Sequence, residues 1–375
     1  MLEKLFGCAL ITKLRSILLM EADFNATNKI IYGNRMLENV RKHKLMPEEI
    51  YSERNHLADD GTLAKVLFYD IVKQMRLPAG ISAVDADNCY DRIAHPIVSL
   101  VFQALGVKTE ACKSFFSTIQ DMKFYLRTGF GDSKQYASAT GDIKTQGLCQ
   151  GNGAAPAGWT VNSIAMINAH KRKGHGIFLR SPITNKTIHL AESLFADDTD
   201  LEHFNINKKD TREETHRALQ ESIINWGHLL IATGGALKPA KCFYHIISFS
   251  WGPDGRWRYD QNETANNLEI YIPLADGSPA RIDHLSASTP TKTLGQMTCP
   301  NGNCDGALQQ MRDKAQKWID KARGGRLHRR NFWFLLDKQF WPGVAFGISS
   351  ITASFAELDQ CMMKIYYSML SISGV

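Results

Sequence analysis

The sequence predicts a fold that mixes α-helices with β-strands. Residues 80–84 are rich in strand-forming side chains, and the apolar residues on either side of Asp197 are typical of two short strands joined by a tight turn. Apolar residues recur at helical spacing along residues 211–232, which indicates an amphipathic helix. Both predicted strand regions lead to carboxylates, so the fold is expected to place acidic side chains at strand ends.

The remaining elements follow from periodicity in chain order. Residues 14–19 are strand-like, and Pro47 and Pro78 each end a helical pattern. A turn at Gly129–Asp132 between two β-prone runs predicts a hairpin over residues 124–137, and a second small hairpin is expected within 251–290. Helical spacing of apolar residues covers 25–40, 63–75, 97–105, 109–122, 159–167, 211–232 and 308–322.

Composition limits the class of protein. The chain has 375 residues, of which 44% are hydrophobic and 22% are charged, as in globular proteins with two or three subdomains. A net charge of +6 is compatible with a polyanionic partner without requiring one. The eight cysteines lack the paired spacing of a zinc site, which favours reduced thiols in an intracellular protein. No apolar run approaches the ~20 residues of a membrane helix, and the N-terminus lacks a signal-peptide cleavage pattern.

The adjacent acids Asp197 and Asp198 are the first candidates for chemistry. Burying two like charges is costly unless a cation or a proton offsets their repulsion, and Mg²⁺ prefers such oxygen ligands. An ordinary solvated turn is the alternative for the dipeptide alone. Asp85 follows the strand-like run 80–84, and a strand that delivers one carboxylate beside a turn that delivers two suits two-metal phosphoryl transfer.

Three sequence boxes in order resemble the motifs of reverse transcriptases. Asp85 with Tyr90 and Asp91 resembles the first catalytic motif, and Phe-Ala-Asp-Asp at 195–198 resembles the aromatic-x-Asp-Asp box. Between them, residues 146–156 resemble the Gly-Leu-Pro-Gln-Gly box, with Cys149 where proline is common. The chain is therefore similar to the reverse transcriptase domain of a non-LTR-type retroelement.

The resemblance implies an α+β right-hand polymerase fold. Fingers would occupy residues 1–80, and the palm, with an antiparallel sheet plus helices, would occupy residues 81–300. A helical thumb-like region would occupy residues 301–375, where a basic helix bearing Lys317 and Lys321 would contact a duplex backbone unless it is simply a solvated face. The palm would include an insertion of unknown role at 251–290. The sequence leaves open whether the chain is part of a longer polyprotein.

The same resemblance implies the metal site and its neighbours. Asp85, Asp197 and Asp198 would hold two Mg²⁺ ions, with Mn²⁺ as a possible substitute. Lys241, in the loop that follows the helix at 211–232, matches the lysine that protonates the pyrophosphate leaving group. Tyr90 would lie under the sugar of the incoming nucleotide and exclude a 2′-hydroxyl. A solvated loop lysine and a tyrosine of the core are the alternatives.

Further nucleotide contacts are implied elsewhere. Residues 14–17 match a Leu-Arg-Pro-Ile element with Ser16 in place of proline, so Arg15, with Lys13, would grip the triphosphate. Two surface cations beside an edge strand are the alternative. Gln150 and Gly151 would line the pocket for the templating pair.

The implied activity is RNA-directed DNA synthesis: transfer of deoxynucleotides to a primer 3′-hydroxyl. The partners would be an RNA template, a DNA primer or RNA–DNA duplex, and deoxynucleoside triphosphates, inside the cell in the nucleus or cytoplasm and away from membranes. An RNA-dependent RNA polymerase and a decayed or domesticated element protein that only binds nucleic acid are the alternatives. Template specificity and oligomeric state are left open.

Overall fold

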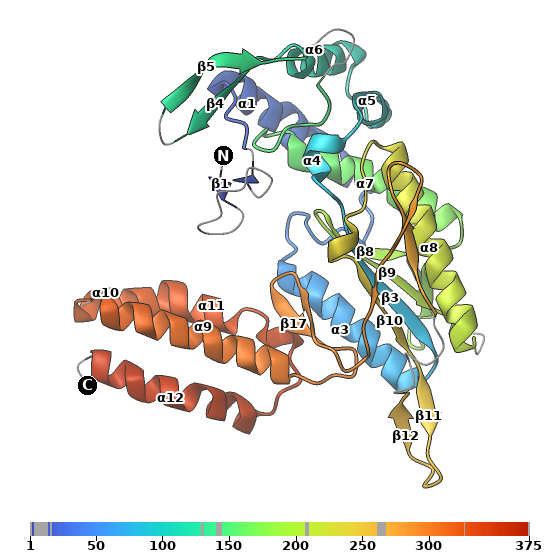
Figure 1. Cartoon of the computed structure of the whole chain (residues 1–375), viewed down its shortest axis with the longest axis vertical. Coiled ribbons are helices and arrows are strands. Elements are labelled where there is room, and N and C mark those ends of the chain that lie inside the picture. Colours follow the sequence, from blue (N-terminus) through green and yellow to red (C-terminus); the bar gives the residue numbers. More distant parts are fainter. Residues whose placement is uncertain are drawn as a thin grey trace.

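The computed structural model describes residues 2–3, 14–15, 17–128, 131–139, 145–206, 210–260, 268–325 and 327–373. Its centre is a five-stranded sheet in the order β15-β10-β3-β9-β8 (Figure 1). The bounds of these strands are β3 Ala79–Asp85, β8 Glu192–Phe195, β9 Asp198–Phe204, β10 Phe243–Ile247 and β15 Asp283–His284. All neighbours are antiparallel except β15, which runs parallel to β10. The expected mixed fold with an antiparallel sheet is confirmed.

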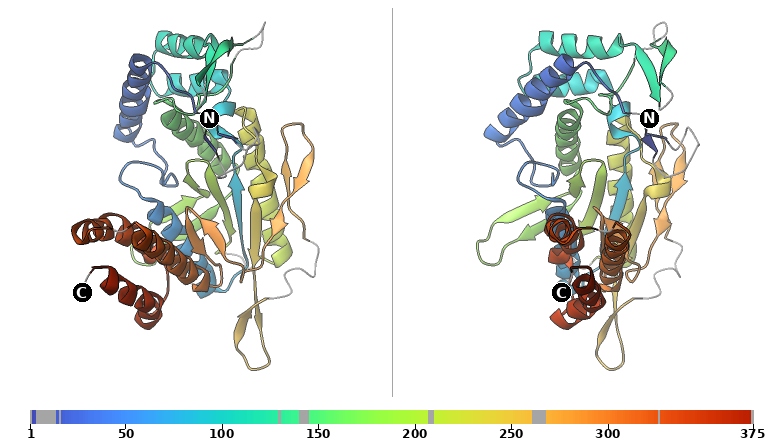
Figure 2. Two further views of the ribbon diagram at one scale, coloured as in Figure 1. Left: turned by 60° about the vertical axis from the view of Figure 1, so that its left-hand side comes forward. Right: turned by 90° about the vertical axis from the view of Figure 1, so that its left-hand side faces the viewer.

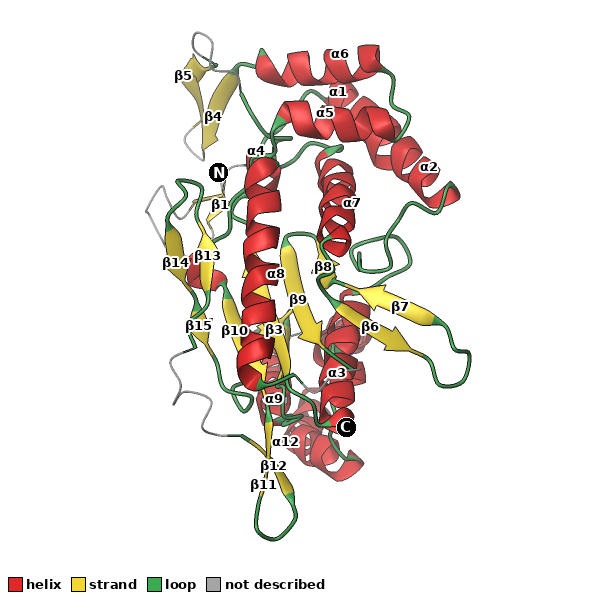
Figure 3. Cartoon of the chain, turned by 90° about the vertical axis from the view of Figure 1, so that its right-hand side faces the viewer, coloured by secondary structure: helices red, strands yellow, loops and turns green. Residues whose placement is uncertain are grey.

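Helices cover both faces of this sheet (Figures 1 and 3). On one face, α8 (Arg212–Ala232) packs Leu219 and Ile223 against Leu201 of β9, and Figure 3 shows this helix lying along the strands. On the other face, α3 (Ala58–Met75) packs Phe68 against Ile81 of β3. The central strand β3 is thereby buried along nearly its whole length, and its carboxyl end has a fixed position.

A helical layer lies beyond the carboxyl end of β3, at the top of Figure 1. At the centre of this layer Tyr32 stacks on Phe102, and the ring of Phe115 contacts both at a tilt. Its elements are α1 Ala22–Asn28, the π-helix η2 Lys29–Met36, α2 Leu37–Lys42, α4 Cys89–Arg92, α5 His95–Ala104, α6 Thr109–Gln120, α7 Ala155–Arg172 and the hairpin β4 Phe124–Thr128 with β5 Gly131–Ala137.

In the first fifty residues, the predicted strand and the predicted helix have different bounds from those expected. Only Leu14–Arg15 forms a strand, β2, which pairs with β1 (Leu2–Glu3), while residues 17–20 have no regular structure. The first helix begins at Ala22 rather than at Asn25 or Thr27, and helical structure ends at Lys42, before Pro47. Its middle turns widen into the π-helix, which brings Tyr32 and Met36 into the core.

The C-terminal helices form a unit with a hydrophobic core of its own (Figures 1 and 2). Within it, α9 packs against α12, and Trp318 contacts the rings of Phe332 and Phe340. Its elements are α9 Asp305–Gly324, α10 Arg329–Leu335, the π-helix η5 Leu336–Phe340, α11 Trp341–Ala345, the 3-10 helix η6 Ile348–Ser350 and α12 Phe355–Ser373.

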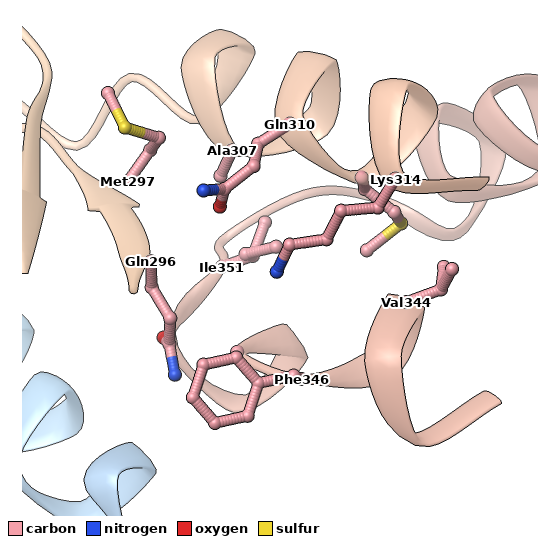
Figure 4. A pocket seen from close by; sticks show the side chains of 10 residues that line it. Gln296, Met297, Ala307, Gln310, Lys314, Val344, Phe346 and Ile351 are labelled. Carbon is pink, nitrogen blue, oxygen red and sulfur yellow. The ribbon is translucent and has the colours of Figure 1, made fainter. Parts of the chain in front are cut away.

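One hairpin joins this helical unit to the sheet domain. It consists of β16 (Thr291–Thr293) and β17 (Gln296–Thr298). The Gln296 side chain donates to Asp59 Oδ1 at 2.5 Å and accepts from the Ser350 hydroxyl at 2.5 Å, so one amide links α3 to η6. Figure 4 shows Gln296 facing Phe346, over which the Lys314 ammonium lies 5.3 Å from the ring centre.

Smaller hairpins complete the chain. β6 (Ile177–Arg180) pairs with β7 (Thr187–Leu190), and the strand that leads into the Asp197 turn, β8, starts after Ala191. In the 251–290 region, the expected hairpin is β13 (Tyr271–Pro273) with β14 (Pro279–Arg281). A further hairpin joins β11 (Phe249–Trp251) to β12 (Trp257–Tyr259). Among the described helices, none is both long and apolar enough to span a membrane.

The loop before α7 is locked onto α4 by its backbone. The Gly147 N–H donates to the Ile93 carbonyl at 3.0 Å and the Leu148 N–H donates to the Tyr90 carbonyl at 2.6 Å. Gly147 has φ +84°, and a Cβ there would lie 2.5 Å from the carbonyl oxygen of Asp91. Glycine is therefore required both by its backbone conformation and by the close approach of a second backbone.

We expect Gly147→Ala to destabilise the protein by clearly more than Gly174→Ala. Gly174 has a similar φ of +83° but no atom within 4 Å of its added Cβ, so that change carries only the left-handed penalty of about 1–2 kcal/mol. At Gly147 the backbone of Asp91 must also move. Denaturant unfolding of both variants measures the difference, and equal losses would contradict this account of the loop.

Candidate active site

The register of the sheet brings the predicted carboxylates together. Asp85 ends β3 and lies directly opposite Asp198, the first residue of β9. Phe195 pairs with Asp198, so Ala196 and Asp197 form a two-residue turn between β8 and β9. Directly opposed residues of antiparallel strands have Cα atoms about 4.5–5.5 Å apart. The geometry thus gathers Asp85, Asp197 and Asp198 at one end of the sheet.

These three carboxylates line a cleft of about 850 Å³. Its walls are the end of β3, the β8–β9 turn, the N-terminal half of α3 and the β16–β17 hairpin. Three lysines also line it: Lys65, Lys241 and Lys292. A cleft with carboxylates on one wall and ammonium groups around them can bind a metal ion together with a polyanion.

The Lys241 ammonium bonds both oxygens of Asp85, at 2.8 and 2.9 Å. Its loop is held against the end of β3 because the Lys238 N–H donates to the Asp85 carbonyl at 2.9 Å. Burial lowers the pKa of Lys241, but the hydrogen bonds and charge of Asp85 outweigh it and raise that pKa overall. Lys241 is therefore a protonated cation beside the carboxylates, and its predicted role as a proton donor stays a prediction.

A second ion-paired group braces the same loop. The Lys238 ammonium lies 3.0 Å from Asp87 Oδ1, and Arg92 lies 3.0 Å from Asp87 Oδ2. Burial raises the pKa of Asp87, yet Lys238 and Arg92 together hold it below its usual range. Asp87 thus connects the loop to α4 rather than facing the cleft.

Burial and like charges both act on the carboxyl of Asp198, which lines the cleft. Burial, followed by the charges of Asp197 and Asp85, raises the pKa of Asp198 to about 6. Like charges held this close favour either a proton or a bound cation. The oxygen-only donor set is the kind that Mg²⁺ prefers. Within the described residues no group of three metal-ligating side chains is ready to hold an ion. The Lys241 ammonium bonds both oxygens of Asp85 and would compete with a metal ion there.

Acidic residues continue along the same face of β9. Asp198 is followed by Asp200 and Glu202 at alternate positions. The Lys65 ammonium, on a side chain only 1% exposed, bonds Asp200 Oδ1 at 2.8 Å. Burial, then the charge of Asp200, raises the pKa of Glu202 to about 8, so this carboxyl is mostly protonated at neutral pH. The negative charge along this face of β9 is thus reduced by the Lys65 ammonium at Asp200 and by the raised pKa of Glu202.

The sequence prediction missed Lys65. It lies on the apolar face of α3, together with the buried residues Gly61, Phe68 and Val72. A lysine at a core-facing position is rarely buried without a carboxylate partner. The position of Lys65 on the apolar face of the predicted helix could have indicated a buried ion pair, although it could not identify Asp200 as the partner.

Three of the predicted nucleotide-contacting residues, Tyr90, Gln150 and Gly151, are not among the described residues that line the cleft. Tyr90 is half-buried against the core, where burial, followed by the charges of Cys89 and Asp197, raises its pKa to about 12. The Gln150 backbone N–H donates to Asp91 Oδ1 at 3.1 Å. Arg15 is described only through its backbone in β2, and Lys13 lies outside the described residues.

Gly151 has a structural explanation. Its φ is +112°, and a Cβ there would lie 2.3 Å from the Leu18 carbonyl oxygen. The Leu18 N–H donates to the Gln150 carbonyl at 2.7 Å. The glycine therefore allows residues 17–18 to pack against this loop, and its contact with a templating base remains a prediction.

Comparison with known proteins found similarity only among solved structures. No protein-family model and no curated protein matches the chain. Telomerase from Candida tropicalis, in complex with a TWJ fragment of telomeric RNA, has 12% identity and a TM-score of 0.40 over 96% of this chain and 52% of that chain. Telomerase from Candida albicans in complex with the same kind of fragment has 11% identity and a TM-score of 0.34 over 93% and 51%. The chain thus spans about half the length of these structures.

We expect Lys241→Gln to strengthen Mn²⁺ binding to the isolated protein by up to about fivefold. The variant removes the ammonium that competes for Asp85, and a partly exposed ion pair contributes up to ~1 kcal/mol. Electron paramagnetic resonance of free Mn²⁺ during titration measures the affinity. Lys238→Gln is the matched control because it removes an equal charge that pairs with Asp87 instead. Equal effects of the two variants would contradict a specific competition at Asp85.

Proposed function

We propose that the chain is an RNA-directed DNA polymerase that transfers deoxynucleotides to a primer 3′-hydroxyl. The observation that carries this proposal is the cross-strand placement of Asp85 and Asp198, with Asp197 in the adjoining turn and Lys241 bound to Asp85. The ordered boxes around Asp85, Gln150 and Asp197 support a reverse transcriptase over other phosphoryl-transfer enzymes. A non-LTR-type retroelement as the source of the chain is part of the same proposal.

In this proposal Asp85, Asp197 and Asp198 hold two Mg²⁺ ions. When bound, the ions lower the pKa of the attacking hydroxyl and offset charge on the triphosphate. Lys241, released from Asp85, donates its proton to the pyrophosphate leaving group, for which a lysine held near a forming anion is suited. Arg15, and Lys13 beside it, bind the triphosphate, while Gln150 and Gly151 contact the templating pair.

The regions of the chain take the corresponding roles. Residues 1–80 serve as fingers, residues 81–300 as the palm and residues 301–375 as a thumb. Lys317 and Lys321 are exposed on α9 and are available to contact the phosphates of an RNA–DNA duplex. The enzyme acts inside the cell, where template, primer and deoxynucleoside triphosphates are present.

Primer extension on RNA and DNA templates tests the activity. The wild-type protein should extend a primer with deoxynucleotides in Mg²⁺, and Asp85→Asn should lower the rate by more than ~100-fold because it removes a metal ligand. Asp254→Asn, which changes a carboxylate in the β11–β12 turn, is the control and should leave the rate unchanged. Binding of nucleic acid without any extension would assign the chain to the binding-only class.

We expect Tyr90→Val to admit ribonucleotides while deoxynucleotides are still used. A packed aromatic ring against C2′ of the sugar leaves no room for the 2′-hydroxyl, and a smaller side chain removes that wall. The ratio of kcat/KM for deoxy- and ribonucleotides measures the change, and we expect it to fall by at least about tenfold, the equivalent of 1.4 kcal/mol. If Tyr90→Val discriminates between deoxy- and ribonucleotides as the wild type does, Tyr90 is a residue of the core and not a sugar-contacting residue. If the wild-type protein uses both kinds of nucleotide equally well, the chain is an RNA polymerase instead.

A further inference from the structure

The turn that carries Asp197 has a backbone conformation that its sequence does not favour. Ala196 has φ +55°, in the left-handed region, where a two-residue hairpin turn usually has glycine. A non-glycine residue keeps such a conformation only when surrounding contacts hold it there. The direction of the Asp197 carboxylate therefore depends on whatever fixes the backbone of Ala196.

Trp159 supplies that contact. Its indole N–H donates to the Ala196 carbonyl oxygen at 2.5 Å, and its side chain is 4% exposed. Trp159 lies on α7, a long helix whose flanking residues Gly158 and Val161 are buried. A Cβ on Gly158 would lie 2.2 Å from Leu148, so the helix is packed closely against the loop 147–150. The donor is thus held by a rigid part of the molecule.

The other side of the same indole contacts the predicted sugar-binding residue. The rings of Trp159 and Tyr90 meet edge to face, with centroids 6.5 Å apart and planes at 76°. After burial and the charge of Cys89, the charge of Asp197 also contributes to the raised pKa of Tyr90. One side chain therefore touches both the turn of the catalytic carboxylates and the ring expected to face the nucleotide sugar.

We propose that Trp159 is the positioning residue that sets the Asp197 turn and the Tyr90 ring relative to each other. Its hydrogen bond holds Ala196 in the left-handed conformation, and its ring supports Tyr90. This role rests on the proposed polymerase function for its catalytic consequence, but the hold on the turn is a property of the protein alone. Trp159 is not among the described residues that line the cleft, so its role is to position the residues that do.

Two substitutions separate the hydrogen bond from the ring. Trp159→Phe keeps an aromatic ring but removes the N–H, which leaves the Ala196 carbonyl without that donor. Trp159→Ala removes both the donor and the support for Tyr90. Trp226→Phe is the matched control, since Trp226 is 3% exposed on α8 and contacts His170 rather than the turn.

Hydrogen exchange of the full chain without metal is the first measurement. We expect Trp159→Phe to lower amide protection in residues 192–204 by about tenfold, as loss of one buried hydrogen bond implies, while protection in α8 stays unchanged. Trp226→Phe should leave residues 192–204 as protected as in the wild type. Unchanged protection of this segment in Trp159→Phe would overturn the proposal, whether or not the chain proves to be a polymerase.

Kinetics are the second measurement. Trp159→Phe should lower kcat about tenfold with the KM for deoxynucleotide within about twofold, because the metal ligands are misplaced while the nucleotide still binds. Trp159→Ala should also lose discrimination against ribonucleotides, as Trp159→Phe should not. A rise in KM alone, or equal sugar discrimination in the two variants, would overturn the coupling. A wild-type protein with no extension activity would refute the proposed function, and the exchange comparison at residues 192–204 and 85–92 would still decide the role of Trp159.

Discussion

The repulsion among three carboxylates at one end of a buried sheet is the constraint on which the surrounding structure depends. Asp85 and Asp198 are fixed opposite each other by the strand register and cannot separate without breaking the sheet. The ammonium of Lys241 offsets the charge of Asp85, and the ammonium of Lys65 offsets that of Asp200, the next acid along the same face of β9. The two lysines come from different parts of the chain, so these ion pairs also tie the loop after α8 and the helix α3 to the sheet.

The loop that carries Lys241 and the turn that carries Asp197 are held in place by different kinds of interaction. The Lys241 loop is attached to the end of β3 by the backbone hydrogen bond from Lys238 to Asp85 and by ion pairs whose lysine side chains are partly exposed to solvent. Such partly exposed ion pairs contribute little to stability. The turn at Ala196 is attached to α7 by the part-buried hydrogen bond from the Trp159 indole. The turn is therefore fixed by a neutral hydrogen bond, while the ammonium of Lys241 is held at Asp85 by charge.

The sequence predicted those parts of the candidate site that lie at the ends of predicted strands and turns. The convergence of Asp85 with Asp197 and Asp198 could be predicted because a carboxylate at the end of one strand and two carboxylates in a turn can meet at the same edge of an antiparallel sheet. The bond from Lys241 to Asp85 and the pairing of Lys65 with Asp200 could not, because both depend on tertiary contacts across more than a hundred residues. The start of the first helix at Ala22 was missed because its only buried residue, Asn28, interrupts the apolar spacing.

The short segment around Ile50 has a consequence for association between chains. β8 is the last strand of its side of the sheet, and an unpaired edge is a template for pairing with another molecule. Here the Leu194 N–H donates to the Glu49 carbonyl at 2.8 Å and the Tyr51 N–H donates to the Leu194 carbonyl at 2.8 Å. The chain thus closes its own edge beside the Asp197 turn, which disfavours strand exchange and aggregation through this part of the sheet.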